Sequence, residues 1–339
     1  MAGKVPLTMC TISLLICVAA AAPLAKKKVT YVLDKGWPRG IPQNASALSG
    51  VGVDPLAENG TEIYVSARGP DPIGPPILVF NEAGDLLRQW GMHDIKRNES
   101  CMPSFPGCKP DQTWGGHGLS VRPGANGRTQ VWITDFYEFT VKVFDPSGKR
   151  LLTLGHKNKL GFADSDAAHL EFGNVADVDF DQDPGSPAGP VYITDGDTGP
   201  AVTPPQYNHR AMRLQSNIGA PDAQSKPSKL DWIFGSGPTG KTPTVLGSKL
   251  SSMHSIAFHK RTKTVFVADR ENNRTLHLSA GGSDGSTGGK LLGEWHGEKC
   301  LNLGAFQPLT SDFRPRETSP VHRRLPETWI RSAYSIDLT

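Results

Sequence analysis

The sequence has no long basic run and no marked excess of either charge. Its 339 residues include 36 Lys or Arg against 33 Asp or Glu, which gives a net charge of +3. Without a basic stretch to contact phosphates, nucleic acid is a poor candidate for a partner. Hydrophobic residues are sparse, at 37%, and no segment carries a helical stripe. Collagen, coiled coils and multi-span membrane proteins are therefore excluded, whereas short strands joined by many turns fit this composition.

Cysteine is also scarce, with five residues, two of them in an apolar N-terminal segment. The run from Met9 to Ala22 follows a positive flank, ends in alanines and is too short for a membrane-spanning helix. We predict that residues 1–22 are a signal peptide, that the protein is secreted or lies in the lumen of the secretory pathway, and that no membrane span remains after cleavage. Cys101 and Cys108 flank a loop with Pro and Gly, which predicts a local disulfide.

Four N-x-S/T sequons support the same compartment. They start in turn-like sequence at Asn44, Asn59, Asn98 and Asn273, and they predict surface N-glycosylation.

A hexapeptide with alternating apolar positions recurs along the chain. Its copies are S-G-V-G-V-D at 49–54, H-G-L-S-V-R at 117–122, A-D-V-D-F-D at 176–181 and H-S-I-A-F-H at 254–259. A second apolar strand follows each copy, ending in Asp in three cases, and most units continue with a third and a fourth strand. Four short strands per unit, repeated, are typical of β-propeller blades. A generic β-sandwich would not explain why the alternation and the Asp recur in register.

We therefore predict an all-β fold, a β-propeller with about four recognisable blades over residues 29–296. The remaining residues, 297–339, read as a patternless basic tail.

The first hexapeptide position holds Ser49, His117, Ala176 and His254. Because the first strand of a blade lines the central channel, we expect these side chains at one depth. Two neutral imidazoles brought together suit zinc and similar ions, although two ligands do not complete a zinc site. A lone histidine is more often a hydrogen-bonded structural residue.

Other residues at the same end of the channel are suited to binding an anion. Arg68 ends the second strand of the first blade, and Arg270 follows the second strand of the fourth. An arginine fork suits a carboxylate, but arginines at strand ends are as often ordinary surface residues or partners of an Asp. Tyr207, in the long third-blade loop, is a candidate phenol for proton transfer.

From about residue 31 to 296 the chain resembles the NHL-repeat family, and within it the peptidyl-α-hydroxyglycine α-amidating lyases. The matching segments include G-W-P at 36–38, G-H-G-L-S-V, Y-I-T-D-G, M-H-S-I-A-F and V-A-D-R-E-N-N-R, of which the last two are the most specific. The resemblance implies a six-bladed propeller, a zinc ion held by three histidines on the channel axis, and a structural calcium ion.

The resemblance also implies roles for individual residues. These are His117 and His254 as zinc ligands, Arg68 and Arg270 for the substrate carboxylate or the developing charge, Tyr207 for the hydroxyl proton, and Val51 and Leu119 at the calcium ion. The substrate would be a C-terminally hydroxyglycine-extended peptide, cleaved to a peptide amide and glyoxylate. A peptidylglycine hydroxylase would be the pathway partner.

The chain departs from the lyase pattern in two places. The lyases read D-G-Y-x-N-x-R in the third blade, whereas here Asp195-Gly196 is followed by an insertion before Tyr207 and Asn208. A P-H-D segment for the third histidine is absent from the sequence, and His322 in the tail is a poor substitute. We interpret the tail as a disordered extension or the product of a truncated gene model.

Two other functions stay open. The first is a non-catalytic propeller that acts as a scaffold for a peptide or protein. The second, weaker one is a propeller hydrolase or lactonase, which would need several carboxylates or Asn residues around calcium, and the channel-facing histidines argue against it. Tight stoichiometric zinc and glyoxylate release would distinguish the lyase from the scaffold.

Overall fold

The computed structural model describes residues 34, 36–41, 47–68, 75–95, 116–123, 129–135, 138–157, 159, 161, 170–181, 189–197, 208–215, 230–236, 250–281 and 288–296. The chain divides into two units, Met1–Lys35 and Gly36–Thr339, and the strands below all lie in the second. The predicted signal peptide, the predicted Cys101–Cys108 disulfide, the sequons at Asn44 and Asn98, and the tail lie outside the described residues.

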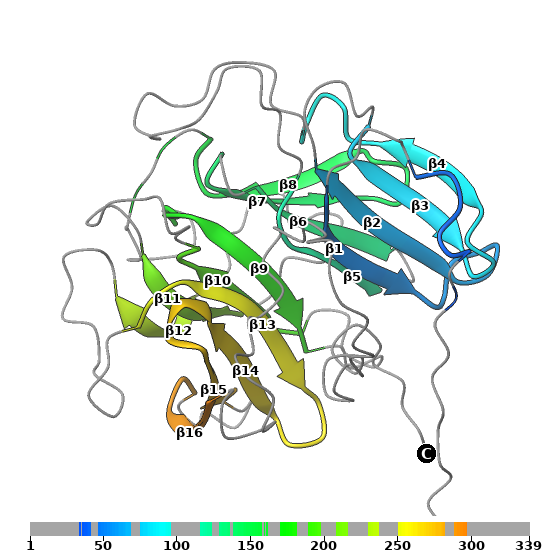
Figure 1. Cartoon of the computed structure of the whole chain (residues 1–339). Helices are drawn as coiled ribbons and strands as arrows, with labels where there is room; N and C mark the ends of the chain where they lie inside the picture. The colour runs from blue at the N-terminus through cyan, green and yellow to red at the C-terminus, as the bar shows by residue number, and fades with distance from the viewer. Residues whose placement is uncertain are drawn as a thin grey trace, which may run out of the picture. The chain divides into compact units, whose positions relative to one another are not determined.

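Four antiparallel sheets of four strands each make up the described regular structure (Figure 1). They are blade 1 (β1 Ala47–Asp54, β2 Glu62–Arg68, β3 Ile77–Asn81, β4 Leu86–Trp90), blade 2 (β5 Leu119–Pro123, β6 Thr129–Asp135, β7 Thr140–Phe144, β8 Arg150–Leu154), blade 3 (β9 Val175–Phe180, β10 Val191–Asp195, β11 His209–Leu214, β12 Leu230–Ser236) and blade 4 (β13 Met253–His259, β14 Thr264–Asp269, β15 Arg274–Ser279, β16 Leu291–His296). In every blade each strand pairs with the next. The one helical turn in these ranges is a 3-10 turn, Arg270–Asn272. No helix within them is long and apolar enough to span a lipid bilayer.

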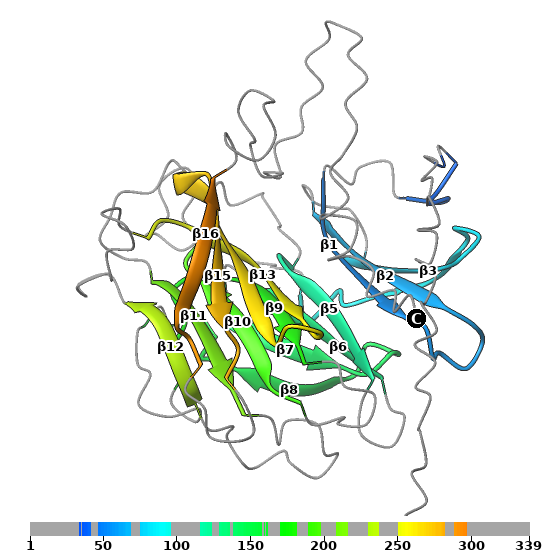
Figure 2. The same ribbon diagram turned by 90° about the horizontal axis from the view of Figure 1, so that it is seen from below.

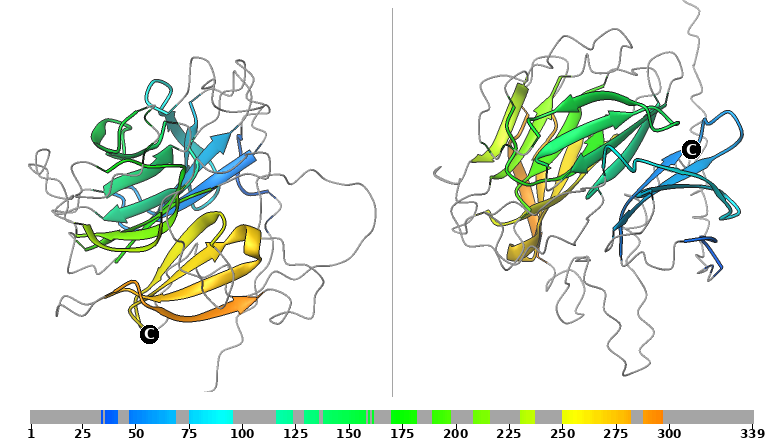
Figure 3. Two further views of the ribbon diagram at one scale, coloured as in Figure 1. Left: turned by 90° about the vertical axis from the view of Figure 1, so that its left-hand side faces the viewer. Right: turned by 90° about the horizontal axis from the view of Figure 1, so that it is seen from above.

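The first strands of the four blades are neighbours. β1 packs beside β5, β5 beside β9, and β9 beside β13, and Figures 2 and 3 show the sheets in this succession. The hexapeptides of the sequence lie on these innermost strands. The predicted all-β propeller with four recognisable blades is thereby confirmed.

The apolar alternation buries one blade face against the next. Between blades 2 and 3, the rings of Trp132 and Phe180 lie 5.2 Å apart, and between blades 3 and 4 Tyr192 stacks on Phe258 at 5.2 Å. Blades 1 and 2 share a cluster that includes Tyr64. Burying side chains of this size stabilises the packing by roughly 2–3 kcal/mol each, so the core of the propeller lies between its blades.

Two carboxylates of β9 add polar contacts to the packing of blade 3 on blade 4. The N–H of Ile256 donates to Asp177 at 3.2 Å, and the N–H of Phe258 donates to Asp179 at 2.7 Å. Burial raises the pKa of Asp177 to about 7 and that of Asp179 to about 6, although these backbone donors oppose the shift. Both carboxyl groups therefore change from protonated to ionised close to neutral pH.

The aspartate that ends the second strand joins several segments of its blade through hydrogen bonds. Asp195 accepts hydrogen bonds from Asn208 Nδ2 at 2.6 Å, Arg210 Nε at 3.0 Å and the N–H of Gly173 at 2.8 Å. We call this set of hydrogen bonds to the second-strand aspartate the Asp clasp. It recurs in blade 4, where Asp269 accepts hydrogen bonds from Asn272, Arg274 and the N–H of Ser251. The N-x-R part of the lyase-like motifs is therefore structural in both blades.

Candidate metal centre

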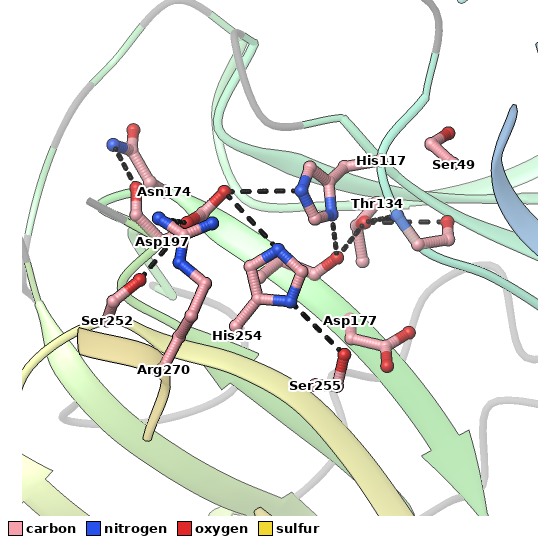
Figure 4. A network of polar contacts seen from close by, with 12 residues as sticks. Ser49, His117, Thr134, Asn174, Asp177, Asp197, Ser252, His254, Ser255 and Arg270 are labelled. Carbon is pink, nitrogen blue, oxygen red and sulfur yellow. Dashed lines mark hydrogen bonds and ion pairs between the residues drawn. The ribbon is translucent and has the colours of Figure 1, made fainter. Parts of the chain in front are cut away.

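The first residue of each hexapeptide lies at an irregularity of the sheet. The register of β1, β9 and β13 shifts at Ser49, Ala176 and His254, and His117 stands two residues before the start of β5, where its N–H donates to Thr134 O at 2.7 Å. A bulge changes the direction of a side chain. His117 and His254 meet here, with ring centroids 4.9 Å apart and planes at 74° (Figure 4).

Asp197, just beyond β10, joins the two histidines. Its Oδ2 lies 3.2 Å from His117 Nε2 and 3.9 Å from His254 Nε2. The other ring nitrogens are engaged elsewhere, because His117 Nδ1 lies 2.8 Å from Ala176 O and His254 Nδ1 lies 3.2 Å from Ser255 Oγ. These contacts orient both rings with Nε2 toward the carboxylate, as the outer partners of metal-binding histidines do.

The second carboxylate oxygen of Asp197 is held from blade 4. Arg270 Nη2 lies 3.0 Å from Oδ1, and Ser252 Oγ donates to Oδ1 at 3.2 Å. Burial alone would raise the pKa of Asp197, but His254, His117 and Arg270 together lower it well below its usual range. Asp197 is therefore a carboxylate throughout the physiological pH range, and its two oxygens have separate partners.

This arrangement offers a cation three donor atoms. One ligand atom each from His117, Asp197 and His254 lies within 4.8 Å of the others. Two imidazoles and a carboxylate form a ligand set that catalytic zinc sites use, with a further position for water or substrate, and imidazole also suits other transition metals. The cluster is a candidate metal site, and its donors do not identify the ion.

The predicted site residues have different outcomes. His117, His254 and Arg270 come together in the cluster. Arg68 ends β2 opposite Ala47, but its side chain lies outside the described residues, as does all of Tyr207. Arg270, expected to meet a substrate carboxylate, is paired with a carboxylate of the chain itself.

The calcium and glycosylation predictions stay predictions. Val51 and Leu119 lie in β1 and β5, opposite Val65 and Ile133. Among the described residues, the His–Asp–His cluster is the only group of three or more His, Cys, Asp or Glu side chains close enough to share an ion. Two sequon asparagines are described, Asn59 and Asn273, and both are exposed.

Sequence reasoning missed Asp197. It follows the second-strand Asp195 by two residues, in T-D-G-D, and Glu271 follows Asp269 by the same two residues in blade 4, whereas blade 2 has Tyr137 at this place. The segment after a second strand leaves the blade at the end where the first strand begins, so an acid there lies at the histidine end of the channel. In the D-G-Y pattern of the lyases, Asp197 also stands directly in the place of the tyrosine.

No protein-family model matches the sequence, and no curated protein matches it with significance. Among solved structures, similarity extends to a nidogen/laminin complex (15% identity, TM-score 0.40, 74% of this chain and 64% of that one) and a streptogramin B lyase (11%, TM-score 0.39, 77% and 57%). A periplasmic gluconolactonase of Pseudomonas aeruginosa gives 13%, a TM-score of 0.37, and 72% and 69%. This chain spans under two thirds of the first two structures, and similarity at this level carries no argument about activity.

Proposed function

We propose that this protein is a metal-dependent lyase of the secretory pathway, which cleaves peptidyl-α-hydroxyglycine to a peptide amide and glyoxylate. One observation carries the proposal: ligand atoms of His117, Asp197 and His254, from three different blades, lie within 4.8 Å of one another. Arg270 beside them is the cation that recognition of a substrate carboxylate requires.

The donors fit a divalent transition ion. His117 and His254 offer Nε2 while their Nδ1 atoms are engaged, and Asp197 contributes a negative charge that favours a cation. A bound ion would supply Lewis acidity that makes the hydroxyl of the substrate easier to deprotonate.

Arg270 has the task of holding the substrate still. A guanidinium presents five N–H donors in a fixed fork, so it can contact Asp197 and a substrate carboxylate together. Its burial beneath the cluster keeps this contact away from bulk water, which strengthens the attraction. The carboxylate of the hydroxyglycine would then fix the position of the bond to be broken.

The reaction needs no oxidant or reductant. The hydroxyl loses its proton, its C–O bond becomes the carbonyl of glyoxylate, the C–N bond breaks, and the amide nitrogen takes up a proton. Asp197 is a poor acceptor for the first proton, because its pKa lies well below the usual range. We assign that step to Tyr207, on the resemblance to the lyases alone.

One observation favours the scaffold as the alternative. Asp197 already receives hydrogen bonds or ion pairs from Arg270, Ser252 and His117. A buried carboxylate with these partners is satisfied without a cation, which is what a peptide-binding propeller without chemistry would retain.

The test measures bound zinc and glyoxylate release on the same protein. After incubation with zinc and desalting, we expect one equivalent of zinc, and glyoxylate release from α-hydroxyhippurate. His117→Ala, His254→Ala and Asp197→Ala should each lose the metal and the activity. The matched control is His156→Ala, which removes an exposed histidine away from the cluster and should retain both.

A folded protein that binds no zinc and releases no glyoxylate would favour the scaffold. Zinc binding without glyoxylate release would support the metal centre and reject the proposed substrate.

A further inference from the structure

The third hexapeptide position shows how the blades cover one another. Leu119, Val178 and Ile256 occupy it in blades 2, 3 and 4 and are 3%, 0% and 5% exposed, whereas Val51 in blade 1 is 41% exposed. The residue before the hexapeptide is likewise exposed in blade 1, where it is Leu48 at 46%. Each later blade has its first strand covered by the blade before it, and blade 1 presents the same positions to solvent.

The opposite face is open on blade 4. The aromatic residue in the middle of the second strand is Tyr64, Trp132 or Tyr192 in blades 1 to 3, each no more than 1% exposed, whereas its counterpart Phe266 is only half-buried. Phe266 packs on rings of its own blade instead, 4.8 Å from His277 and 5.3 Å from Trp295.

Trp295 is itself 43% exposed. Blade 4 thus carries an exposed aromatic cluster on the face that blades 1 to 3 use to bind the next blade.

Polar groups at the sixth hexapeptide position reveal a matching register. The residue at this position contacts one residue of the next blade. The contacted residue stands two places before the first apolar residue of that blade's second strand. The pairs are Asp54 with Thr129 Oγ1 at 2.5 Å, Arg122 with Gly189 O at 3.1 Å, and Asp181 with Lys263 at 3.2 Å. On blade 4 the sixth position is His259, and the matching position on blade 1 is Thr61, which offers a hydroxyl as Thr129 does.

We propose that blade 4 of one molecule binds blade 1 of a second copy of this chain, head to tail, and so repeats the packing of consecutive blades. The fourth-blade face consists of His259, Phe266 and Trp295, and the first-blade face of Val51 and Thr61. A second copy is the occupant that accounts for both exposed faces with one contact and also matches His259 with a hydroxyl. Such an interface is heterologous, because the two molecules contribute different surfaces.

The outer part of blade 1 is already covered by its own chain. Trp37 packs on Phe80 with ring centroids 5.8 Å apart, in the way that Trp90 packs on Phe144 of blade 2 at 5.2 Å. A Cβ on Gly84 would lie 2.5 Å from the Trp37 ring. Trp37 thus occupies on blade 1 the place that Trp90 occupies on blade 2. Trp295 corresponds to Trp90 in its blade, so in the contact between copies Trp295 would replace Trp37 on Phe80, next to the exposed Val51.

The experiment is sedimentation velocity of the full chain from low to high micromolar concentration. We expect reversible self-association that Val51→Asp and Trp295→Asp each weaken at least about tenfold, since each places a charge in an apolar contact. Both residues are exposed, and the circular dichroism spectrum of each variant checks that it is folded. Leu87→Asp, at a leucine of β4 that is 47% exposed, is the matched control and should associate like the wild type.

Mixing the two variants tests the direction of the contact. The Val51→Asp chain keeps its fourth-blade face, and the Trp295→Asp chain keeps its first-blade face, so a mixture should form a one-to-one dimer although neither variant associates alone. A wild-type chain that stays monomeric, an equal loss with Leu87→Asp, or no dimer in the mixture would each overturn the proposal.

Discussion

The stability of the packing between blades 3 and 4 should depend on the protonation of Asp177. The pKa of this carboxyl is raised from 3.8 to about 7, first by burial and further by the charge of Asp179, against the hydrogen bonds from two backbone N–H groups. A carboxyl group with a raised pKa in the folded state contributes stability that is complete below pH 3.8, and this contribution is lost as the pH rises through 7.

The size of the effect follows from the shift. A shift of about 3 units corresponds to about 4 kcal/mol in full, and about 2 kcal/mol of it falls between about pH 5 and about pH 8.5 once partial solvent screening is allowed for. The contribution of Asp177 should therefore make the metal-free protein more stable at about pH 5 than at about pH 8.5.

Comparing Asp177→Asn with the wild type isolates this group. The amide loses one acceptor for the backbone N–H groups, which lowers stability by an amount that does not depend on pH. The pH-dependent part should disappear, so the difference between variant and wild type should change by about 2 kcal/mol between the two pH values. Urea unfolding followed by tryptophan fluorescence measures it.

The control is Gly293→Ala, which changes no titratable group and whose added Cβ has nothing within 4 Å, and it should keep the wild-type pH dependence. If Asp177→Asn shows the same slope as the wild type, the carboxyl does not take up its proton on folding and the reasoning fails.

Two further predictions concern packing and the Asp clasp, and thermal unfolding measures both. A Cβ on Gly50 would lie 2.6 Å from the backbone nitrogen of Leu119, so Gly50→Ala should destabilise the protein by about 1–3 kcal/mol. The control Gly293→Ala, whose added Cβ has nothing within 4 Å, should be neutral or slightly stabilising. Equal effects of the two variants would contradict the close approach of β1 to β5. Arg274→Met leaves a buried aspartate without its cation and should cost about 3–5 kcal/mol. Arg39→Ala, at a side chain 61% exposed, should cost less than about 1 kcal/mol, and a similar loss in both would refute the role of the clasp.

The strands could be predicted from the sequence because the repeat states the same pattern several times. The meeting of His117 and His254 followed from their equal place in that repeat, since equal positions of neighbouring innermost strands lie close together. Asp197 was not predicted in this way, because it lies beyond the apolar strand pattern, and of the other blades only blade 4 has an acid, Glu271, at the same place. The pairing of Arg270 with Asp197 depends on contacts between blades that no local pattern encodes.

The solvent exposure of the Val51 side chain could also not be predicted from the sequence. Its hexapeptide has the same alternation as those of the other blades, and the difference arises only from what covers it.

The Asp clasp of blade 3 has a consequence for how this protein can vary. Asn208 and Arg210 bind Asp195, so the two ends of the stretch from 198 to 207 are tied at the base by the clasp and by Asp197. Lengthening a closed loop costs only about 0.6 kcal/mol for each doubling. Insertions or deletions between Asp197 and Asn208 should therefore leave the blade and the metal ligands in place. Because Tyr207, to which we assign the proton transfer, ends this stretch, such changes should alter the proposed activity more than the free energy of folding.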